Sequence, residues 1–248
     1  MMTKVVLSLV MAALAVGCSV KQPAPVPPTV QVEKVPDVEQ MVASVPLVLY
    51  NGAAGSGVLF KTGKRVGMIT AAHVIADSLK PEEATTYGTG VVSVVGYEPG
   101  TEKIVYATTA TLLKLDPKQD WALLEIAVPH RSMRFATFAD RIPKIGEQVW
   151  MVGSPLLDVG TLSRGIVCHP DRSPSICSDT SLKFIHTDAV GAGGSSGGGL
   201  FDKNGVCIGI VTRRNPITIT MYAVSTYYIH EGICEGLLEP DLMPEFVQ

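Results

Sequence analysis

The feature that most constrains the fold is a glycine-rich turn at residues 191–199, which lies between two short apolar segments. The turn carries Ser196 inside the sequence GSSGG, residues 194–198. Because glycine tolerates backbone conformations that other residues avoid, the chain can turn sharply here and present a serine hydroxyl. Flexible linkers and phosphate-binding loops share this composition, but no Gly-Lys-Ser/Thr follows, and residues 206–212 look like a strand. A tight turn between strands is therefore predicted.

Two upstream segments supply the partners that a serine nucleophile needs. His73 lies in an apolar segment at residues 69–75, and Asp120 opens the apolar run at residues 121–126, which is typical of a buried strand. A neutral imidazole can take the proton of a weakly nucleophilic serine, and a buried carboxylate fixes the tautomer of that imidazole. The order His, Asp, Ser predicts a triad for acyl transfer, made of His73, Asp120 and Ser196.

Parts of this site have alternatives. Taken alone, a histidine in an apolar run is more often a core residue than a catalytic base, and Asp116 is a second, weaker candidate for the acid. The backbone N–H groups of Gly194 and Ser196 are expected to form the oxyanion hole, because the glycines let the backbone aim its amides at a developing negative charge.

The three segments together resemble those of trypsin-like serine peptidases, and residues 187–200 resemble the bacterial HtrA (Deg) branch in particular. Residues 146–155 are similar to the strand that opens the second barrel of that family, so the likeness covers roughly residues 45–230. The resemblance implies a serine endopeptidase that cleaves protein or peptide substrates through an acyl-enzyme. Ser195 stands where HtrA enzymes have Asn, and residues 192–193 are Ala-Gly instead of the usual Asn-Pro.

The resemblance also implies an all-β fold of two six-stranded antiparallel β-barrels with a short C-terminal helix. The expected peptidase domain is residues 45–235, with barrel one at 45–130, barrel two at 145–230 and a tail at 236–248. Strand-like segments separated by turns agree with it. They are 45–50, 57–60, 66–70, 91–97, 104–113 and 122–126 in barrel one, and 148–152, 162–168, 182–187, 198–201, 206–212 and 217–224 in barrel two. The short stretch after Ser196 leaves no room for the PDZ domain that HtrA enzymes usually carry.

Specificity is expected from two places. The resemblance puts Val190 at the base of the primary pocket, which argues against selection of Lys or Arg and favours a small or medium apolar residue. Thr212, Arg213 and Arg214 fall on the strand that pairs with substrate in this family. The two arginines are expected either to recruit acidic side chains or to form a solvated strand end.

The N-terminus resembles a bacterial lipoprotein signal peptide at residues 1–17, because a short basic start and an apolar run too short to span a bilayer precede Gly17-Cys18. Cys18 is then expected to be lipidated and to hold the protein at a membrane. Ser19 after the cysteine favours the outer membrane, facing the periplasm. An ordinary signal peptide is the alternative. Residues 18–44 are expected to form a proline-rich, extended tether.

Export into an oxidising compartment changes how the other cysteines are interpreted. Cys168, Cys177, Cys207 and Cys234 allow three pairings. The preferred bridge is Cys168–Cys177, which would close a small hairpin and stabilise the fold by roughly 2–3 kcal/mol. Cys207 and Cys234 either pair with each other or remain buried thiols.

Composition excludes some partners and leaves one other function open. A net charge of −3 gives no reason to expect a nucleic-acid partner, and no cysteine or histidine spacing suggests a metal or another cofactor. Nothing in the sequence predicts the oligomeric state. The alternative function is a catalytically silent trypsin-fold binding module, because inactive relatives share the fold and the glycine-rich oxyanion loop departs from the HtrA pattern.

Overall fold

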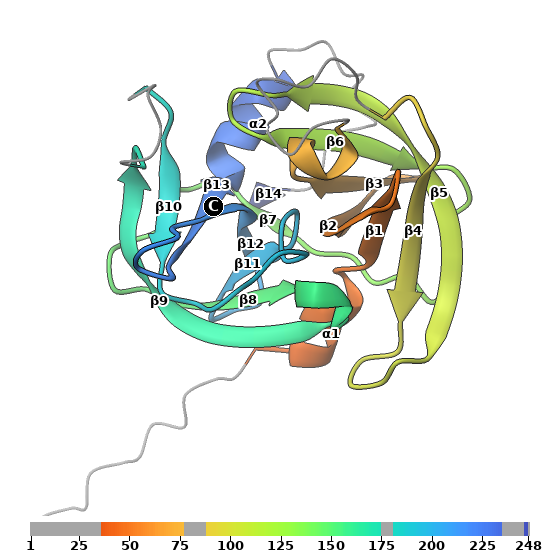
Figure 1. The fold of residues 1–248 in the computed structure, drawn as a ribbon, viewed down its shortest axis with the longest axis horizontal. Coiled ribbons are helices and arrows are strands. Elements are labelled where there is room, and N and C mark those ends of the chain that lie inside the picture. Colours follow the sequence, from red (N-terminus) through yellow and green to blue (C-terminus); the bar gives the residue numbers. More distant parts are fainter. Residues whose placement is uncertain (1–35, 77–87, 175–180, 235–245, 248) are drawn as a thin grey trace, which may run out of the picture. The chain divides into compact units, whose positions relative to one another are not determined.

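The computed structural model describes residues 36–76, 88–174, 181–234 and 246–247. The predicted signal peptide, Cys18, the first part of the predicted tether and Cys177 lie outside these ranges. The described residues form two β-barrels, which Figure 1 shows in orange to yellow-green and in green to blue.

The first barrel consists of six antiparallel strands, closed by the pairing of β1 with β4. Its interior holds apolar residues such as Val48, Leu59, Met68, Val94 and Leu124, all fully buried. Around the barrel the strands are β1 (Leu47–Tyr50), β2 (Ala53–Thr62), β3 (Arg65–Thr70), β6 (Trp121–Ile126), β5 (Ile104–Asp116) and β4 (Val92–Tyr97).

The second barrel also has six antiparallel strands, and the pairing of β11 with β12 closes it. Two short strands, β7 (Phe138–Ala139) and β14 (Phe246–Val247), extend the sheet by parallel pairing beyond β12. The six barrel strands are β11 (Gly199–Asp202), β8 (Gln148–Gly153), β9 (Thr161–Arg172), β10 (Phe184–Thr187), β13 (Met221–Ser225) and β12 (Cys207–Arg214). The predicted all-β architecture of two six-stranded barrels is confirmed.

A shared apolar cluster joins the two barrels. Phe60 and Trp121 of the first barrel are each 1% exposed and pack in one cluster with Phe138, Phe201 and Tyr222 from the second half of the chain. The rings of Phe60 and Phe138 meet edge to face, with centroids 5.8 Å apart. Burial of each large side chain contributes about 1.5–3 kcal/mol, so this cluster fixes one barrel against the other.

Two α-helices accompany the barrels. The predicted C-terminal helix is α2 (Thr226–Cys234), and α1 (Val38–Ala43) lies within the segment predicted to be an extended tether. Asp37 caps α1 by accepting a hydrogen bond from Gln40 N–H at 2.9 Å, and Met41 is 1% exposed in the inter-barrel cluster. The prediction of an extended tether is therefore wrong for residues 37–43. The tail likewise returns to the fold, since Asp140 N–H bonds to Val247 O at 2.8 Å.

Two of the predicted disulfide cysteines can be placed. Neither Cys168 nor Cys207 forms a disulfide with another cysteine in the described part of the chain, and Cys207 is fully buried. Burial raises the pKa of Cys207 to about 12 and, together with Asp188, raises the pKa of Cys168. Because Cys177 and the side chain of Cys234 lie outside the described part of the chain, the bridge between Cys168 and Cys177 stays a prediction.

A partly buried ionic cluster holds the start of the second barrel. Arg141 donates to Glu147 Oε2 at 3.0 Å and to Asp202 Oδ2 at 2.9 Å. Asp202 also accepts hydrogen bonds from the backbone N–H groups of Asn204 and Val206. Burial acts to raise the pKa of Glu147, but the hydrogen bonds from Arg141 and from the backbone of residue 144 lower it below its usual value.

We expect Arg141→Met to lower the free energy of unfolding by about 1–3 kcal/mol at pH 7, because Glu147 and Asp202 lose a charged partner. A lowered carboxyl pKa stabilises the fold above the unfolded pKa of about 4.3, and this contribution disappears as the pH falls through the folded value. Thermal unfolding at pH 7 and below pH 4 measures both effects, and the penalty should shrink in acid. Lys103→Met, which removes an exposed ion pair with Glu98, serves as the control and should cost less than about 0.5 kcal/mol.

Candidate active site

His73 and Asp120 meet at one end of the first barrel. His73 lies on the single-turn 3-10 helix η1 (Ala72–Ile75) directly after β3, and its side chain is 16% exposed. Asp120, just before β6, is 1% exposed and has a left-handed φ of +64°, which aspartate adopts more readily than most residues. His73 Nδ1 lies 2.9 Å from Asp120 Oδ2 and 3.0 Å from Oδ1.

The carboxylate of Asp120 orients the imidazole and the turn that carries it. Asp120 Oδ1 also accepts a hydrogen bond from the backbone N–H of His73 at 3.0 Å. With the Nδ1 proton of a neutral ring donated to the carboxylate, Nε2 keeps its lone pair and can act as a base. The structure therefore brings together the predicted base and acid.

Asp116, the weaker candidate for the acid, has a different role. Its Oδ1 accepts hydrogen bonds from the backbone N–H groups of Lys118 and Gln119, both at 3.0 Å. A carboxylate that bonds to backbone amides two and three residues further on stabilises a turn. Asp116 thus shapes the β5–β6 connection, whereas Asp120 faces the imidazole.

The two adjacent serines of the turn differ in accessibility. Ser195 is 1% exposed and its Oγ accepts a hydrogen bond from Ala192 N–H at 3.3 Å. Ser196 is partly exposed, and its Oγ donates a long hydrogen bond of 3.5 Å to Thr212 O. Among the described residues, no hydrogen bond joins Ser196 to His73, so Ser196 Oγ points toward β12 in this structure.

The backbone of Ser196 lies against the turn that carries His73. A Cβ on Gly55 would lie 2.6 Å from the methyl groups of Val74 and 3.1 Å from Ser196 O, so all three residues meet at this point. At Gly197 φ is +84°, and a Cβ would lie 2.0 Å from Ser56 O and 2.2 Å from Thr70 Oγ1. Only glycine fits at position 197, because a side chain would push the serine turn away from barrel one.

The predicted oxyanion donors are free of other hydrogen bonds within the described part of the chain. Gly193 O accepts a hydrogen bond from Leu156 N–H at 2.7 Å, and Ser195 O accepts one from Gly198 N–H at 3.0 Å. In a trans peptide the N–H points opposite to the C=O, so the N–H groups of Gly194 and Ser196 face away from these contacts. Both donors remain available for an oxyanion.

The residues predicted to bind substrate differ in how far they are exposed to solvent. Val190 is 62% exposed, while Thr212 is 4% exposed and its Oγ1 has no hydrogen-bond partner among the described residues. The guanidinium of Arg213 turns inward, with Nε 3.9 Å from Asp120 Oδ2 and its carbon atom 5.5 Å from the centroid of the Phe184 ring. Only Arg214 is exposed as expected for recruitment of an acidic side chain.

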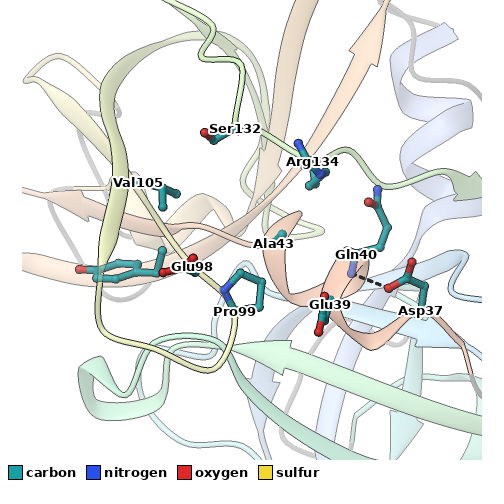
Figure 2. Close-up of a pocket in the computed structure, with 10 residues that line it drawn as sticks. Asp37, Glu39, Gln40, Ala43, Glu98, Pro99, Val105, Ser132 and Arg134 are labelled. Atoms are coloured by element: carbon teal, nitrogen blue, oxygen red, sulfur yellow. Dashed lines mark hydrogen bonds between the residues drawn. The ribbon is translucent and has the colours of Figure 1, made fainter.

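The described residues contain no candidate metal site and no candidate membrane-spanning helix, but they border a cavity. No group of three or more His, Cys, Asp or Glu side chains among them could bind a metal ion, and no helix among them is long and apolar enough to cross a membrane. A cavity of about 310 Å³, shown in Figure 2, is bordered by Glu39 of α1, Pro99 of the β4–β5 connection and Arg134 of the segment between β6 and β7. None of its lining residues belongs to the predicted triad.

Comparisons with known proteins identify the family. Residues 55–210 match the model of the trypsin-like peptidase domain. Over 171 residues the chain is 36% identical to the serine protease Do-like HtrA of Bacillus subtilis, covering 65% of this chain and 33% of that protein. It is 33% identical over 161 residues to the probable periplasmic serine endoprotease DegP-like of Brucella suis, covering 64% and 27%. The chain therefore matches about a third of the length of these relatives.

A solved structure supports the fold. The inactive form of a serine-to-alanine mutant of Rv3671c from M. tuberculosis H37Rv superposes with a TM-score of 0.60 at 23% identity, over 82% of this chain and 91% of that one. The family match extends over more than half of the chain and includes His73, Asp120 and Ser196. This chain belongs to the trypsin-like peptidase domain family, and it is similar to HtrA and DegP-like serine proteases.

Proposed function

We propose that this chain is a serine endopeptidase that hydrolyses peptide bonds of protein substrates through His73, Asp120 and Ser196. The observation that carries the proposal is the bond between His73 Nδ1 and the buried carboxylate of Asp120, at 2.9 Å. This arrangement leaves Nε2 as the proton acceptor. The serine protease names of the relatives agree with this reaction.

In the proposed mechanism, Ser196 Oγ first rotates from Thr212 O toward Nε2 of His73. His73 takes the hydroxyl proton as Oγ attacks the carbonyl carbon, and the N–H groups of Gly194 and Ser196 stabilise the oxyanion. The imidazolium, held by Asp120, returns the proton to the leaving amine. In the second half of the reaction, His73 takes a proton from water as the water attacks the acyl-enzyme. The proton then passes to Ser196 Oγ as the acyl group leaves.

Two features suggest which substrates are preferred: Val190 favours an apolar residue on the acyl side of the cleaved bond, and Arg214 favours an acidic residue nearby. Val190 is exposed and supplies no negative charge for Lys or Arg. Arg213 is engaged with Asp120 and Phe184, which leaves Arg214 as the exposed cation on the substrate-pairing strand. Substrates with an acidic residue near Arg214 should bind more tightly than neutral ones.

A silent binding module is the second candidate, because Ser196 Oγ bonds to Thr212 O rather than to His73 in this structure. The two functions differ in whether Ser196 is activated. A fluorophosphonate reacts with an activated serine and leaves an unactivated serine unmodified. Covalent labelling of the wild type supports the peptidase, and a folded chain that resists labelling would support the binding module.

Ser196→Ala should abolish hydrolysis of casein and of peptide substrates and should prevent fluorophosphonate labelling, because it removes the attacking oxygen. Ser195→Ala is the matched control, since Ser195 is buried and its Oγ already accepts from Ala192 N–H. That variant should keep most of the activity. Reversed results for the two variants would assign the nucleophile to Ser195. Turnover and labelling measure both variants at equal protein concentration.

Asp120→Asn should lower kcat by about 10⁴-fold, because the amide can favour the imidazole tautomer that has no lone pair on Nε2. Asp116→Asn should change kcat little, since an asparagine oxygen can accept the same turn hydrogen bonds. Steady-state kinetics on one peptide substrate gives both values. A comparable loss in the Asp116 variant would transfer the role of acid to that residue.

We also propose that the protein is exported and anchored through lipidated Cys18 to the outer membrane, facing the periplasm. The DegP-like relatives are named as periplasmic, which agrees with export. Several acyl chains would hold the protein firmly at a membrane.

Cys18→Ala should therefore shift the protein out of the membrane fraction or leave an uncleaved precursor. Metabolic labelling with a fatty-acid analogue should mark the wild type alone. A soluble, cleaved and unlabelled wild type would contradict the anchor without affecting the proposed peptidase activity.

A further inference from the structure

Ser56, which neither the motifs nor the family match singles out, connects barrel one to the oxyanion loop of barrel two. It lies on β2 and is fully buried. Its Oγ donates a hydrogen bond to Gly194 O at 2.9 Å and accepts one from Ser154 N–H at 3.0 Å. Its own N–H donates to Ser196 O at 2.7 Å. A single residue thus bonds to both residues whose amides are the proposed oxyanion donors.

Ser56 and Leu156 hold the peptide groups on the two sides of Gly194. Ser56 Oγ holds the carbonyl of Gly194, and Leu156 N–H holds the carbonyl of Gly193 at 2.7 Å. Since the Gly193 carbonyl and the Gly194 N–H belong to one peptide plane, rotation of that plane would turn the donor away and expose a carbonyl in its place.

The loop needs such external support because it has few side chains of its own. Gly191, Gly193 and Gly194 can each adopt many backbone conformations, and Gly194 has a φ of +97°. A glycine-rich loop loses more conformational entropy when ordered than one built from other residues. Hydrogen bonds from buried, rigid strands can offset that cost.

The connection runs through Ser154 as well as through the loop itself. Ser154 N–H donates to Ser56 Oγ, and the turn that follows, η2 (Pro155–Leu157), supplies the N–H of Leu156 to Gly193 O. A Cβ on Gly194 would lie only 2.4 Å from Ser154 O, so these segments are in close contact. The hydroxyl of Ser56 therefore joins the strand of barrel one, the η2 turn and the oxyanion loop.

We propose that Ser56 is a positioning residue that holds the oxyanion hole in its donor-inward conformation. This inference rests on the proposed peptidase function. Ser56 does not contact substrate. It bonds to the carbonyls of Gly194 and Ser196 and to the Ser154 N–H, and so restrains the backbone next to the peptide groups that carry the Gly194 and Ser196 amides. Because these amides bind the oxyanion rather than the planar carbonyl of the substrate, loss of the hydroxyl should affect kcat much more than KM.

Ser56→Ala should lower kcat about 10- to 100-fold with KM changed by less than about 2-fold, a smaller loss than the removal of an oxyanion donor itself. Ser56→Thr retains a hydroxyl and should recover part of the activity if the added methyl is accommodated. The inhibition constant of a peptide aldehyde, which forms a tetrahedral adduct with the serine, should rise in parallel with the loss in kcat/KM.

Ser44→Ala is a matched control for the loss of a buried serine hydroxyl. Ser44 is also fully buried, and its Oγ donates to Met41 O at 2.7 Å, with no contact to the oxyanion loop. Both alanine variants should lose about 0.5–1.5 kcal/mol of stability. Only the Ser56 variant should lose kcat when rates are normalised to the folded fraction from thermal unfolding.

Three outcomes would overturn the inference. A folded Ser56→Ala enzyme with unchanged kcat, or one whose loss matches that of Ser44→Ala, would show a purely structural role. A large increase in KM with unchanged kcat would place Ser56 in substrate binding. If the wild type neither turns over substrate nor reacts with a fluorophosphonate, the proposed function fails and this inference fails with it.

Discussion

The packing between the two barrels is the constraint on which the proposed site depends. His73 and Asp120 come from barrel one, and Ser196 comes from the turn before β11 of barrel two. Neither barrel holds the complete set. The edge-to-face contact of Phe60 with Phe138, within the cluster around Trp121, sets the barrels at one relative position. Hydrogen bonds between the barrels then fix the position of the serine turn more closely than apolar packing alone does. One example is the bond from Ser56 N–H to Ser196 O.

Glycine at the serine turn reflects the same constraint. A Cβ on Gly197 would collide with Ser56 O and Thr70 Oγ1 of barrel one, so close approach of the two backbones requires glycine there. The approach places the serine against η1, but it leaves a loop with few side chains to stabilise its conformation. Support for the loop therefore comes from its neighbours, among them the Ser56 hydroxyl and the backbone N–H of Leu156.

The architecture could be predicted because the motifs that carry the family resemblance are local in sequence. Short apolar segments and turn residues predicted the barrel strands, and the motifs around His73, Asp120 and Ser196 identified the candidate site before any geometry was known. It did not predict that residues 38–43 form a helix, although Asp37 is a good N-cap and Val38, Met41 and Val42 share a helical face. The prolines before that segment favour an extended chain, and this signal outweighed the helical pattern of residues 38–43. The functions of Ser56 and Arg213 depend on contacts between distant segments, so no local pattern could indicate them.

The burial of the Asp120 carboxylate explains why donors from both barrels lie around it. A carboxylate that is 1% exposed needs several donors, and it receives the imidazole and the backbone N–H of His73, with Arg213 Nε at 3.9 Å. The bond to the His73 backbone ties the acid to the fold of η1 as well as to the ring. Arg213 adds a positive charge near the same carboxylate and so reduces the field that stabilises an imidazolium. The inward turn of Arg213 thus makes it part of the electrostatic environment of His73 rather than a contact for acidic substrates.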